Sequence, residues 1–220
     1  MYRLFQLLDS EQVARLTGIA QSASWVDGRA TNPTNSGKNN QQIEPGAARD
    51  ESGRLLTDAL RASLTFNENA LPVAVAPPLL SRYSPEMAYA IHGDNAFLQV
   101  GPQTFRNDLA CTIFLADPAS YDGGALVIHN GDVKTAFRLP AGHAILYPAT
   151  MLHEVEPVTR GERLAAFTFI QSRIADPAKR AIVSEMGIIA RTERERLDPP
   201  AHARLLVIQQ NLLRDWGDAP

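Results

Sequence analysis

The chain has 220 residues, a length that suits one domain with peripheral additions. Hydrophobic residues make up 45% and charged residues 20%, and the formal net charge of −3 gives no reason to expect nucleic acid or an anionic membrane as a partner. The single cysteine, Cys111, excludes an internal disulfide. Because no run approaches ~20 apolar residues and the N-terminus lacks a secretory signal pattern, we expect a soluble, cytoplasmic protein.

The N-terminal third predicts two helices on either side of a polar segment. A helix is expected over residues 7–23, because Asp9 or Ser10 can cap it and Val13 and Leu16 begin an apolar stripe. Residues 26–43 are rich in Asn, Ser, Thr and Gly, which predicts a long loop that is too polar to bury. A second helix is expected over residues 50–67.

From residue 73 the pattern changes to short β-type runs separated by turn residues, up to residue 172. Many short strands at this spacing predict an antiparallel sandwich or barrel. Helical patterns return over residues 176–196 and 199–216. We therefore expect three parts: N-terminal helices and a polar loop packed on the core (1–72), a β domain (73–173) and a C-terminal helical extension (174–220).

His92 and Asp94 stand at the end of a predicted strand, and their spacing points both side chains to the same face. The best candidate for a third metal ligand is His153, which opens another apolar strand after a Pro-containing turn. Two imidazoles and one carboxylate on one face of an octahedron form the triad of non-haem Fe(II) oxygenases. That arrangement leaves positions open for a bidentate co-substrate and O₂.

Arg163 follows His153 by ten residues and begins the next β run. A guanidinium there can hold a carboxylate through two parallel hydrogen bonds. 2-Oxoglutarate fits this geometry, because its keto acid end chelates iron and its distal carboxylate would reach the arginine. Two rival functions use a similar fold: a non-catalytic jelly-roll module that binds or senses iron or another ligand, and a cupin-type enzyme that uses iron alone. Neither rival needs Arg163.

Several stretches of the chain are similar to known enzymes. They are "WVDGRAT" (25–31), "KNNQQ" (38–42), "RYSPEMAYAIHGDNAF" (82–97), "RNDLACTIFLADPASYDGGALVIHNG" (106–131) and "LPAGHAILYPATMLHEVEPVTRGERLAAFTFIQS" (139–172). Together they resemble the Fe(II)/2-oxoglutarate dioxygenases of the prolyl 4-hydroxylase type, and within these the bacterial PKHD-type, PiuC-like hydroxylases. The resemblance covers most of residues 1–180.

The resemblance implies an α+β fold with a double-stranded β-helix (jelly-roll) core, N-terminal helices packed on it and a C-terminal helical extension. It implies Fe(II) bound by His92, Asp94 and His153, and 2-oxoglutarate held by Arg163. The group is ascorbate-dependent and often linked to iron uptake, so L-ascorbate and a role in iron homeostasis are also implied. The expected reaction is hydroxylation of an unactivated C–H bond, with release of succinate and CO₂.

Other polar residues are candidates for contacts within this site. Tyr83 and Tyr89 have the same strand parity and are expected near 2-oxoglutarate. The segment 31–42 is expected to fold over the barrel mouth as a lid, with Lys38, Asn39 or Gln41 meeting the substrate. Gln171 is a further candidate for a substrate contact. The substrate itself, a peptide or a small molecule, and a homo-oligomeric state are left open.

Overall fold

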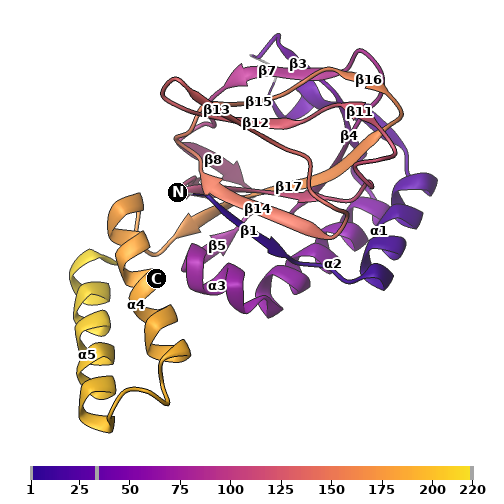
Figure 1. Cartoon of the computed structure of the whole chain (residues 1–220). Helices are drawn as coiled ribbons and strands as arrows, with labels where there is room; N and C mark the ends of the chain where they lie inside the picture. The colour runs from indigo at the N-terminus through magenta and orange to yellow at the C-terminus, as the bar shows by residue number, and fades with distance from the viewer. Residues whose placement is uncertain (1, 33–34, 219–220) are drawn as a thin grey trace.

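Two antiparallel β-sheets face each other in the structure, a computed structural model that describes residues 2–32 and 35–218 (Figure 1). Within these residues the larger sheet has eight strands. Its main order is β1 (Arg3–Gln6), β14 (His143–Pro148), β10 (Leu109–Phe114), β17 (Arg163–Ser172), β6 (Leu79–Tyr83), β4 (Gln41–Ile43) and β2 (Trp25–Asp27), and β5 (Pro72–Val75) also pairs with β17. The smaller sheet runs β13 (Val133–Phe137), β12 (Leu126–Asn130), β15 (His153–Val155), β7 (Ala88–His92) and β3 (Lys38–Asn39). Two short pairs complete the β structure: β8 (Phe97–Val100) with β9 (Gln103–Arg106), and β11 (Asp122–Gly123) with β16 (Val158–Arg160). The predicted jelly-roll architecture is confirmed.

The larger sheet is covered on both faces, which explains its apolar sequence. Every residue of β10 is buried. Leu109, Cys111 and Ile113 pack with the helices, whereas Ala110 and Phe114 belong to the cluster between the sheets. A strand with two covered faces reads as a continuous apolar run because neither set of alternating side chains meets water.

Three N-terminal helices cover the outer face of the larger sheet: α1 (Ser10–Ser22), α2 (Ala47–Ala62) and α3 (Leu64–Ala70) (Figure 1). Asp9 caps α1 and forms a reciprocal capping box with Gln12, as the sequence predicts. The single helix expected over residues 50–67 is wrong. Ser63 has an extended backbone, ends α2 and caps α3 by accepting a hydrogen bond from the Phe66 amide.

The segment expected to be a long polar loop is instead structured. It forms β2, the short 3-10 helix η1 (Gly28–Thr31), β3 and β4, with residues 33–34 outside the described residues. The expectation that it is too polar to bury is also wrong, since Lys38, Asn40 and Gln42 are all buried. These side chains face a cavity between the sheets, where polar groups can meet a ligand.

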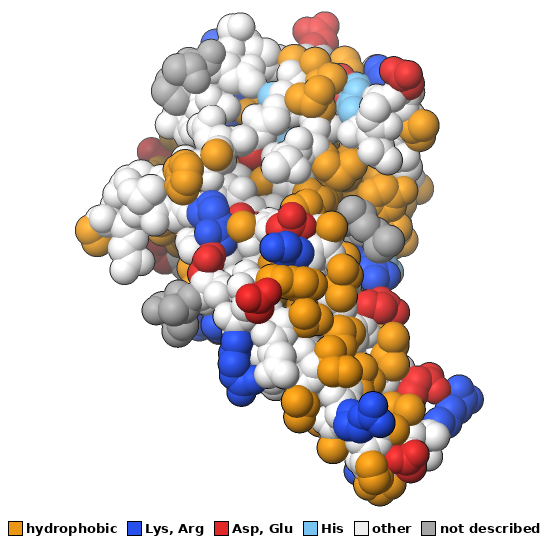
Figure 2. All heavy atoms as spheres, turned by 90° about the vertical axis from the view of Figure 1, so that its left-hand side faces the viewer, with side chains coloured by type: hydrophobic (Ala, Val, Ile, Leu, Met, Phe, Trp, Pro, Cys, Tyr) orange, Lys and Arg blue, Asp and Glu red, His pale blue; other side chains and the backbone are white. Residues whose placement is uncertain are grey.

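The C-terminal extension is a hairpin of two helices, α4 (Pro177–Thr192) and α5 (Pro199–Trp216), that projects from the sandwich (Figure 1). Each begins with a proline after an aspartate cap, Asp176 or Asp198. Figure 2 shows hydrophobic side chains gathered along this hairpin, among them the exposed Ile182, Ile189, Leu206, Val207 and Ile208. Among the described residues, no helix is both long and apolar enough to cross a membrane. The three-part division of the chain stays a prediction.

Candidate metal and co-substrate site

Two histidines meet across neighbouring strands of the smaller sheet. His92 ends β7, His153 begins β15, and the two residues are direct partners in the antiparallel pairing. Their ring centroids are 4.3 Å apart. Asp94 follows just beyond the end of β7, and its Oδ1 lies 3.9 Å from His153 Nε2. One ligand atom from each of the three residues lies within 4.8 Å of the others, so the predicted triad comes together in space.

The ring of each histidine is oriented by a contact between its Nδ1 atom and a backbone carbonyl oxygen. His92 Nδ1 lies 2.8 Å from the Ala90 carbonyl oxygen, and His153 Nδ1 lies 3.0 Å from the Met151 carbonyl oxygen. Because a carbonyl only accepts, each Nδ1 carries its proton and donates, which leaves Nε2 as the nitrogen that can bind a metal. Burial lowers the pKa of His92 to about 4, so this side chain is neutral near pH 7.

The carboxylate completes a donor set that fits Fe(II). Asp94 Oδ2 is buried and has no hydrogen-bond partner in the described part of the chain, and burial raises the pKa of Asp94. A divalent cation would offset the cost of burying the charged carboxylate, because it stabilises the charge and gives the buried oxygen a partner. Two imidazole nitrogens and one carboxylate oxygen are the donors that non-haem Fe(II) sites use.

The triad opens into a cavity of about 630 Å³ between the two sheets, which is also lined by Arg163. Arg163 is only 2% exposed, and its Nε has no hydrogen-bond partner among the residues that the structure describes. Its guanidinium carbon lies 5.0 Å from the ring centroid of Tyr83 and 5.5 Å from that of Phe114. A buried guanidinium without a carboxylate is costly, so this side chain is suited to receive one from a ligand.

The "DGG" sequence of residues 122–124 is needed where the chain passes Arg163. Gly123 and Gly124 both have positive φ, +69° and +61°. A Cβ on Gly123 would lie 2.0 Å from the Pro157 carbonyl oxygen, and one on Gly124 would lie 3.2 Å from Arg163 Cδ. Only glycine allows this backbone conformation and this close approach together.

Tyr83 lies beside Arg163 and is fixed by a residue that the sequence reasoning missed. The two are register partners on β6 and β17, and Tyr83 is 3% exposed. Asn40 Nδ2 donates a hydrogen bond of 2.9 Å to the Tyr83 hydroxyl oxygen. The phenolic proton is therefore free to be donated elsewhere. Asn40 in turn packs on Gly28, where a Cβ would come within 1.8 Å of Asn40 Oδ1.

Two more tyrosines border the histidines. Tyr89 stacks on His92 with ring centroids 3.7 Å apart, and burial raises its pKa to about 12. Tyr147 meets His153 edge-on at 5.2 Å, and burial raises its pKa well above the usual value. Both hydroxyls therefore stay protonated at neutral pH and line the cavity as neutral hydrogen-bonding groups.

The other predicted site residues divide between the cavity and the outside. Lys38 lines the cavity, but Asn39 is exposed. Gln41 lies outside the cavity lining, and its Oε1 accepts a hydrogen bond from Arg82 Nε. Gln171 also lies outside the cavity lining, and its Oε1 accepts a hydrogen bond from the Arg106 amide.

Asn40 and Gln42 line the cavity together with Lys38. These three residues alternate along the chain, so the period of a strand was the signal that could have grouped them.

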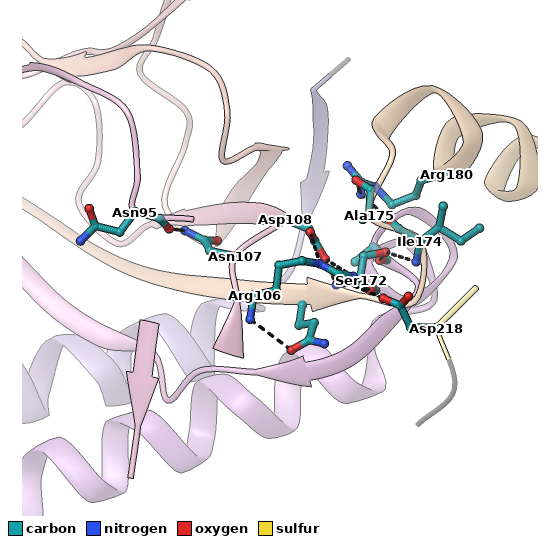
Figure 3. Close-up of polar contacts among 11 residues, drawn as sticks. Asn95, Arg106, Asn107, Asp108, Ser172, Ile174, Ala175, Arg180 and Asp218 are labelled. Carbon is teal, nitrogen blue, oxygen red and sulfur yellow. Dashed lines mark hydrogen bonds and ion pairs between the residues drawn. The ribbon is translucent and has the colours of Figure 1, made fainter. Parts of the chain in front are cut away.

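The segment after Asp94 is tied down by a polar network drawn in Figure 3. Asn107 Nδ2 donates to the Asn95 carbonyl oxygen at 3.2 Å. The neighbouring Arg106 makes a two-pronged ion pair with Asp108, at 2.8 and 3.1 Å, and a further contact of 2.6 Å with Asp218 near the C-terminus. This network holds the base of the β8–β9 hairpin, whose residues line the cavity next to the triad.

A jelly roll with a His-Asp-His cluster and a buried arginine in one cavity defines the class of 2-oxoglutarate- and Fe(II)-dependent oxygenases. Residues 78–171 match the model of the 2OG-Fe(II) oxygenase superfamily. A PKHD-type hydroxylase of Sphingopyxis alaskensis is 45% identical, over 98% of this chain and 99% of its own length. Another, from Methylobacillus flagellatus, is 40% identical, over 97% of each chain.

Solved structures show the same fold at low sequence identity. A prolyl-4-hydroxylase of Pseudomonas putida has a TM-score of 0.56 and 19% identity, over 77% of this chain and 92% of its own. A prolyl hydroxylase of Trichoplax adhaerens has a TM-score of 0.59 and 14% identity, over 82% and 86%. This chain belongs to the PKHD-type hydroxylases of the 2OG-Fe(II) oxygenase superfamily. It is therefore an oxidoreductase that uses Fe(II) and 2-oxoglutarate.

Proposed function

We propose that His92, Asp94 and His153 hold the Fe(II) and that Arg163 holds the distal carboxylate of 2-oxoglutarate. The observation that carries this proposal is the shared cavity, in which a buried guanidinium, without a carboxylate partner among the described residues, accompanies two imidazoles whose Nδ1 atoms are bound to carbonyl oxygens. When bound, Fe(II) with 2-oxoglutarate and O₂ supplies the oxidant that hydroxylates an unactivated C–H bond, and succinate and CO₂ are released.

The residues of the chain position the reactants and exclude water. The imidazole Nδ1–H bonds orient both rings and leave the Nε2 atoms as the nitrogens that would bind the metal. We propose that the Tyr83 hydroxyl, whose oxygen already accepts from Asn40, donates its proton to the same carboxylate as Arg163, since its ring lies beside that guanidinium. The rings of Tyr89 and Tyr147 pack against the histidines and limit the access of water to them.

Metal binding and turnover test this proposal. The protein is expected to bind one Fe(II) per chain, and each of His92→Ala, Asp94→Ala and His153→Ala is expected to abolish that binding. Full metal occupancy in the His153→Ala protein would show that the third ligand is a different residue. Turnover is measured with Fe(II), 2-oxoglutarate and pools of metabolites or peptides, by the gain of one oxygen atom in a product.

The rival function, a non-catalytic iron- or ligand-binding module, is disfavoured by Arg163. A module that only binds metal needs the three ligands and has no use for a buried guanidinium beside them. The rival predicts iron binding without formation of succinate from 2-oxoglutarate. Succinate release that depends on the intact triad therefore separates the two functions.

The segment 31–42 is proposed to border the substrate. Thr31, Asn32 and Lys38 line the cavity, while β3 and β4 pair with β7 and β6. Whether this wall also opens as a lid stays a prediction, and part of the segment, residues 33–34, lies outside the described residues. Limited proteolysis with and without 2-oxoglutarate and a redox-inert metal tests it. Equal cleavage rates in all states would argue against a lid.

Several expectations from the sequence stay proposals. A peptidyl side chain or a small molecule as substrate, L-ascorbate as a reductant, a role in iron homeostasis and a cytoplasmic location are each consistent with the resemblance to PKHD-type hydroxylases. The absence of nucleic acid and membrane partners is proposed from the formal net charge of −3, and a homo-oligomeric state stays open. Retention of activity in repeated turnovers without ascorbate would remove that cofactor from the proposal.

A further inference from the structure

Lys38 is a buried cation with few partners. The residue is 5% exposed, and lysine is seldom buried at this level unless it is paired with an acid. Its Nζ donates one hydrogen bond, of 2.7 Å, to the Thr31 hydroxyl. An ammonium group has three N–H donors, so two remain available. Among the described residues, no carboxylate forms an ion pair with this group.

The ammonium group lies close to the proposed metal ligands. β3 pairs with β7, and Lys38 stands opposite Tyr89 in the register. Lys38 Nζ is 5.3 Å from the centroid of the Tyr89 ring, which itself stacks on His92 at 3.7 Å. The Phe167 ring lies 5.9 Å from the same Nζ atom. A group bound by Lys38 would therefore be separated from the proposed ligand His92 by the Tyr89 ring.

The charges that line the cavity do not balance without another anion. In the described residues these charges are Lys38, Arg49, Arg163 and the carboxylate of Asp94. A divalent cation and the doubly charged 2-oxoglutarate cancel each other, and Arg163 cancels Asp94. Lys38 and Arg49 then remain as positive charges in a partly enclosed cavity, where the effective dielectric is low and charge imbalance is costly. The Asp27 carboxylate outside the lining attracts Lys38 as well, but it is already paired with Arg29.

Two further observations support a ligand at this position. Gln42, 2% exposed, lines the same cavity, and its Nε2 has no hydrogen-bond partner in the part of the chain described. Burial lowers the pKa of Lys38 to about 8, although the charges of Asp27 and Asp94 oppose that shift. Besides the Thr31 hydroxyl, the ammonium group faces the Tyr89 and Phe167 rings, which offer it cation–π contacts but no counter-anion.

We propose that Lys38 recognises a negatively charged group on the substrate, a carboxylate or a comparable anion, with Gln42 as a neighbouring donor. This inference rests on the proposed function and names the chemical class of its substrate. The anionic group is carried either by a small organic acid or by an acidic side chain of a peptide. The charge pair would orient the substrate so that a C–H bond faces the metal site.

Binding of matched probes tests the proposal without knowledge of the natural substrate. The protein is loaded with Zn(II) and N-oxalylglycine, which occupies the 2-oxoglutarate position and cannot be decarboxylated. Ligand-detected NMR then compares small organic acids with their carboxamides, and short peptides containing Asp or Glu with the same peptides containing Asn or Gln. The variants are Lys38→Met, Lys38→Arg and, as a control for loss of charge, Lys134→Met on the exposed part of β13.

The expected result is tighter binding of the acidic probe than of its amide in at least one of the two comparisons, small acids or peptides. The comparison that shows this preference identifies the source of the anion. Lys38→Met should weaken that binding by about tenfold or more, Lys38→Arg should retain part of it, and Lys134→Met should leave it unchanged. No preference for acids, no acid binding at all, or an equal loss in the Lys134→Met protein would overturn the proposal.

Two controls separate this inference from the proposed function and from a structural role. Binding of 2-oxoglutarate to the Fe(II) protein tests the proposed function by itself and should be the same in wild type and Lys38→Met. A loss of 2-oxoglutarate binding only in the variant would assign Lys38 to the co-substrate instead. Lys38→Met should also keep or raise the melting temperature. A clear decrease in both Lys38→Met and Lys38→Gln would assign Lys38 to the fold and overturn the proposal.

Discussion

Replacing Arg163 with Met should separate co-substrate binding from folding and from metal binding. The guanidinium is 2% exposed and lies between the Tyr83 and Phe114 rings, so methionine can fill much of the same space. Losing the paired donors leaves the distal carboxylate of 2-oxoglutarate buried without its charged partner. Truncating one member of a buried charge pair costs about 2–5 kcal/mol. The dissociation constant of 2-oxoglutarate should therefore rise from about 30-fold to several thousand-fold.

The same substitution should leave the ligand-free protein at least as stable, because the wild-type guanidinium has no carboxylate partner among the described residues. A ligand at 100 times its dissociation constant stabilises the folded state by about 2.7 kcal/mol. For a chain of this size, that corresponds to an increase of about 5–11 °C in melting temperature. Wild type should show this increase on addition of 2-oxoglutarate with a redox-inert metal, and Arg163→Met should not.

Arg82→Met is the matched control. Arg82 is on the neighbouring strand β6, lies outside the cavity lining and pairs with Gln41 and Trp25. This variant should bind 2-oxoglutarate like wild type. An unchanged dissociation constant in the Arg163→Met protein, measured by calorimetry with the metal bound, would refute the assignment of the carboxylate to Arg163. A simultaneous loss of metal would show that Arg163 supports the triad rather than the co-substrate.

Three further predictions follow from single side chains. Burial lowers the pKa of Lys38 from 10.5 to about 8, so between these pH values the unfolded chain binds more protons than the folded protein. The wild type therefore gains stability as pH rises from 8 to 10.5, and the extra stability of Lys38→Met over it should shrink. A pH-independent difference in thermal unfolding would contradict this. Gly28→Ala should displace Asn40, since the new Cβ would lie 1.8 Å from its Oδ1, and should weaken 2-oxoglutarate binding in calorimetry while the protein still folds; wild-type affinity would disprove the link. Asp108→Asn breaks a two-pronged ion pair with Arg106 and should lower the free energy of unfolding by about 1.5–3 kcal/mol in urea titrations, the value for hydrogen bonds to a charged group. A change below about 0.5 kcal/mol would show that the network adds little.

The chemistry of the proposed site was readable from the sequence because it depends on short-range geometry. His92 and Asp94 share a face through the two-residue period of a strand, and the turn before His153 marks the start of another strand. Arg163 begins the strand after that. These local features, together with the resemblance, were enough to predict the jelly roll, the triad and the arginine.

The direct pairing of His92 with His153 was not readable in the same way. It depends on the register between β7 and β15, which are far apart in the chain, and a shift by one residue would turn one imidazole to the other face. The pairing is set by the whole smaller sheet and not by either strand alone.

The segment 38–42 shows most clearly what only the tertiary structure decided. The sequence predicts that Lys38, Asn39 or Gln41 meets the substrate, whereas the cavity is lined by Lys38, Asn40 and Gln42. Alternation divides a strand into two faces, but it does not say which face lies inside. Burial normally selects the apolar face. Here both faces are polar, and the inner one is set by non-local pairing of β3 with β7 and of β4 with β6 around a cavity that receives charged ligands.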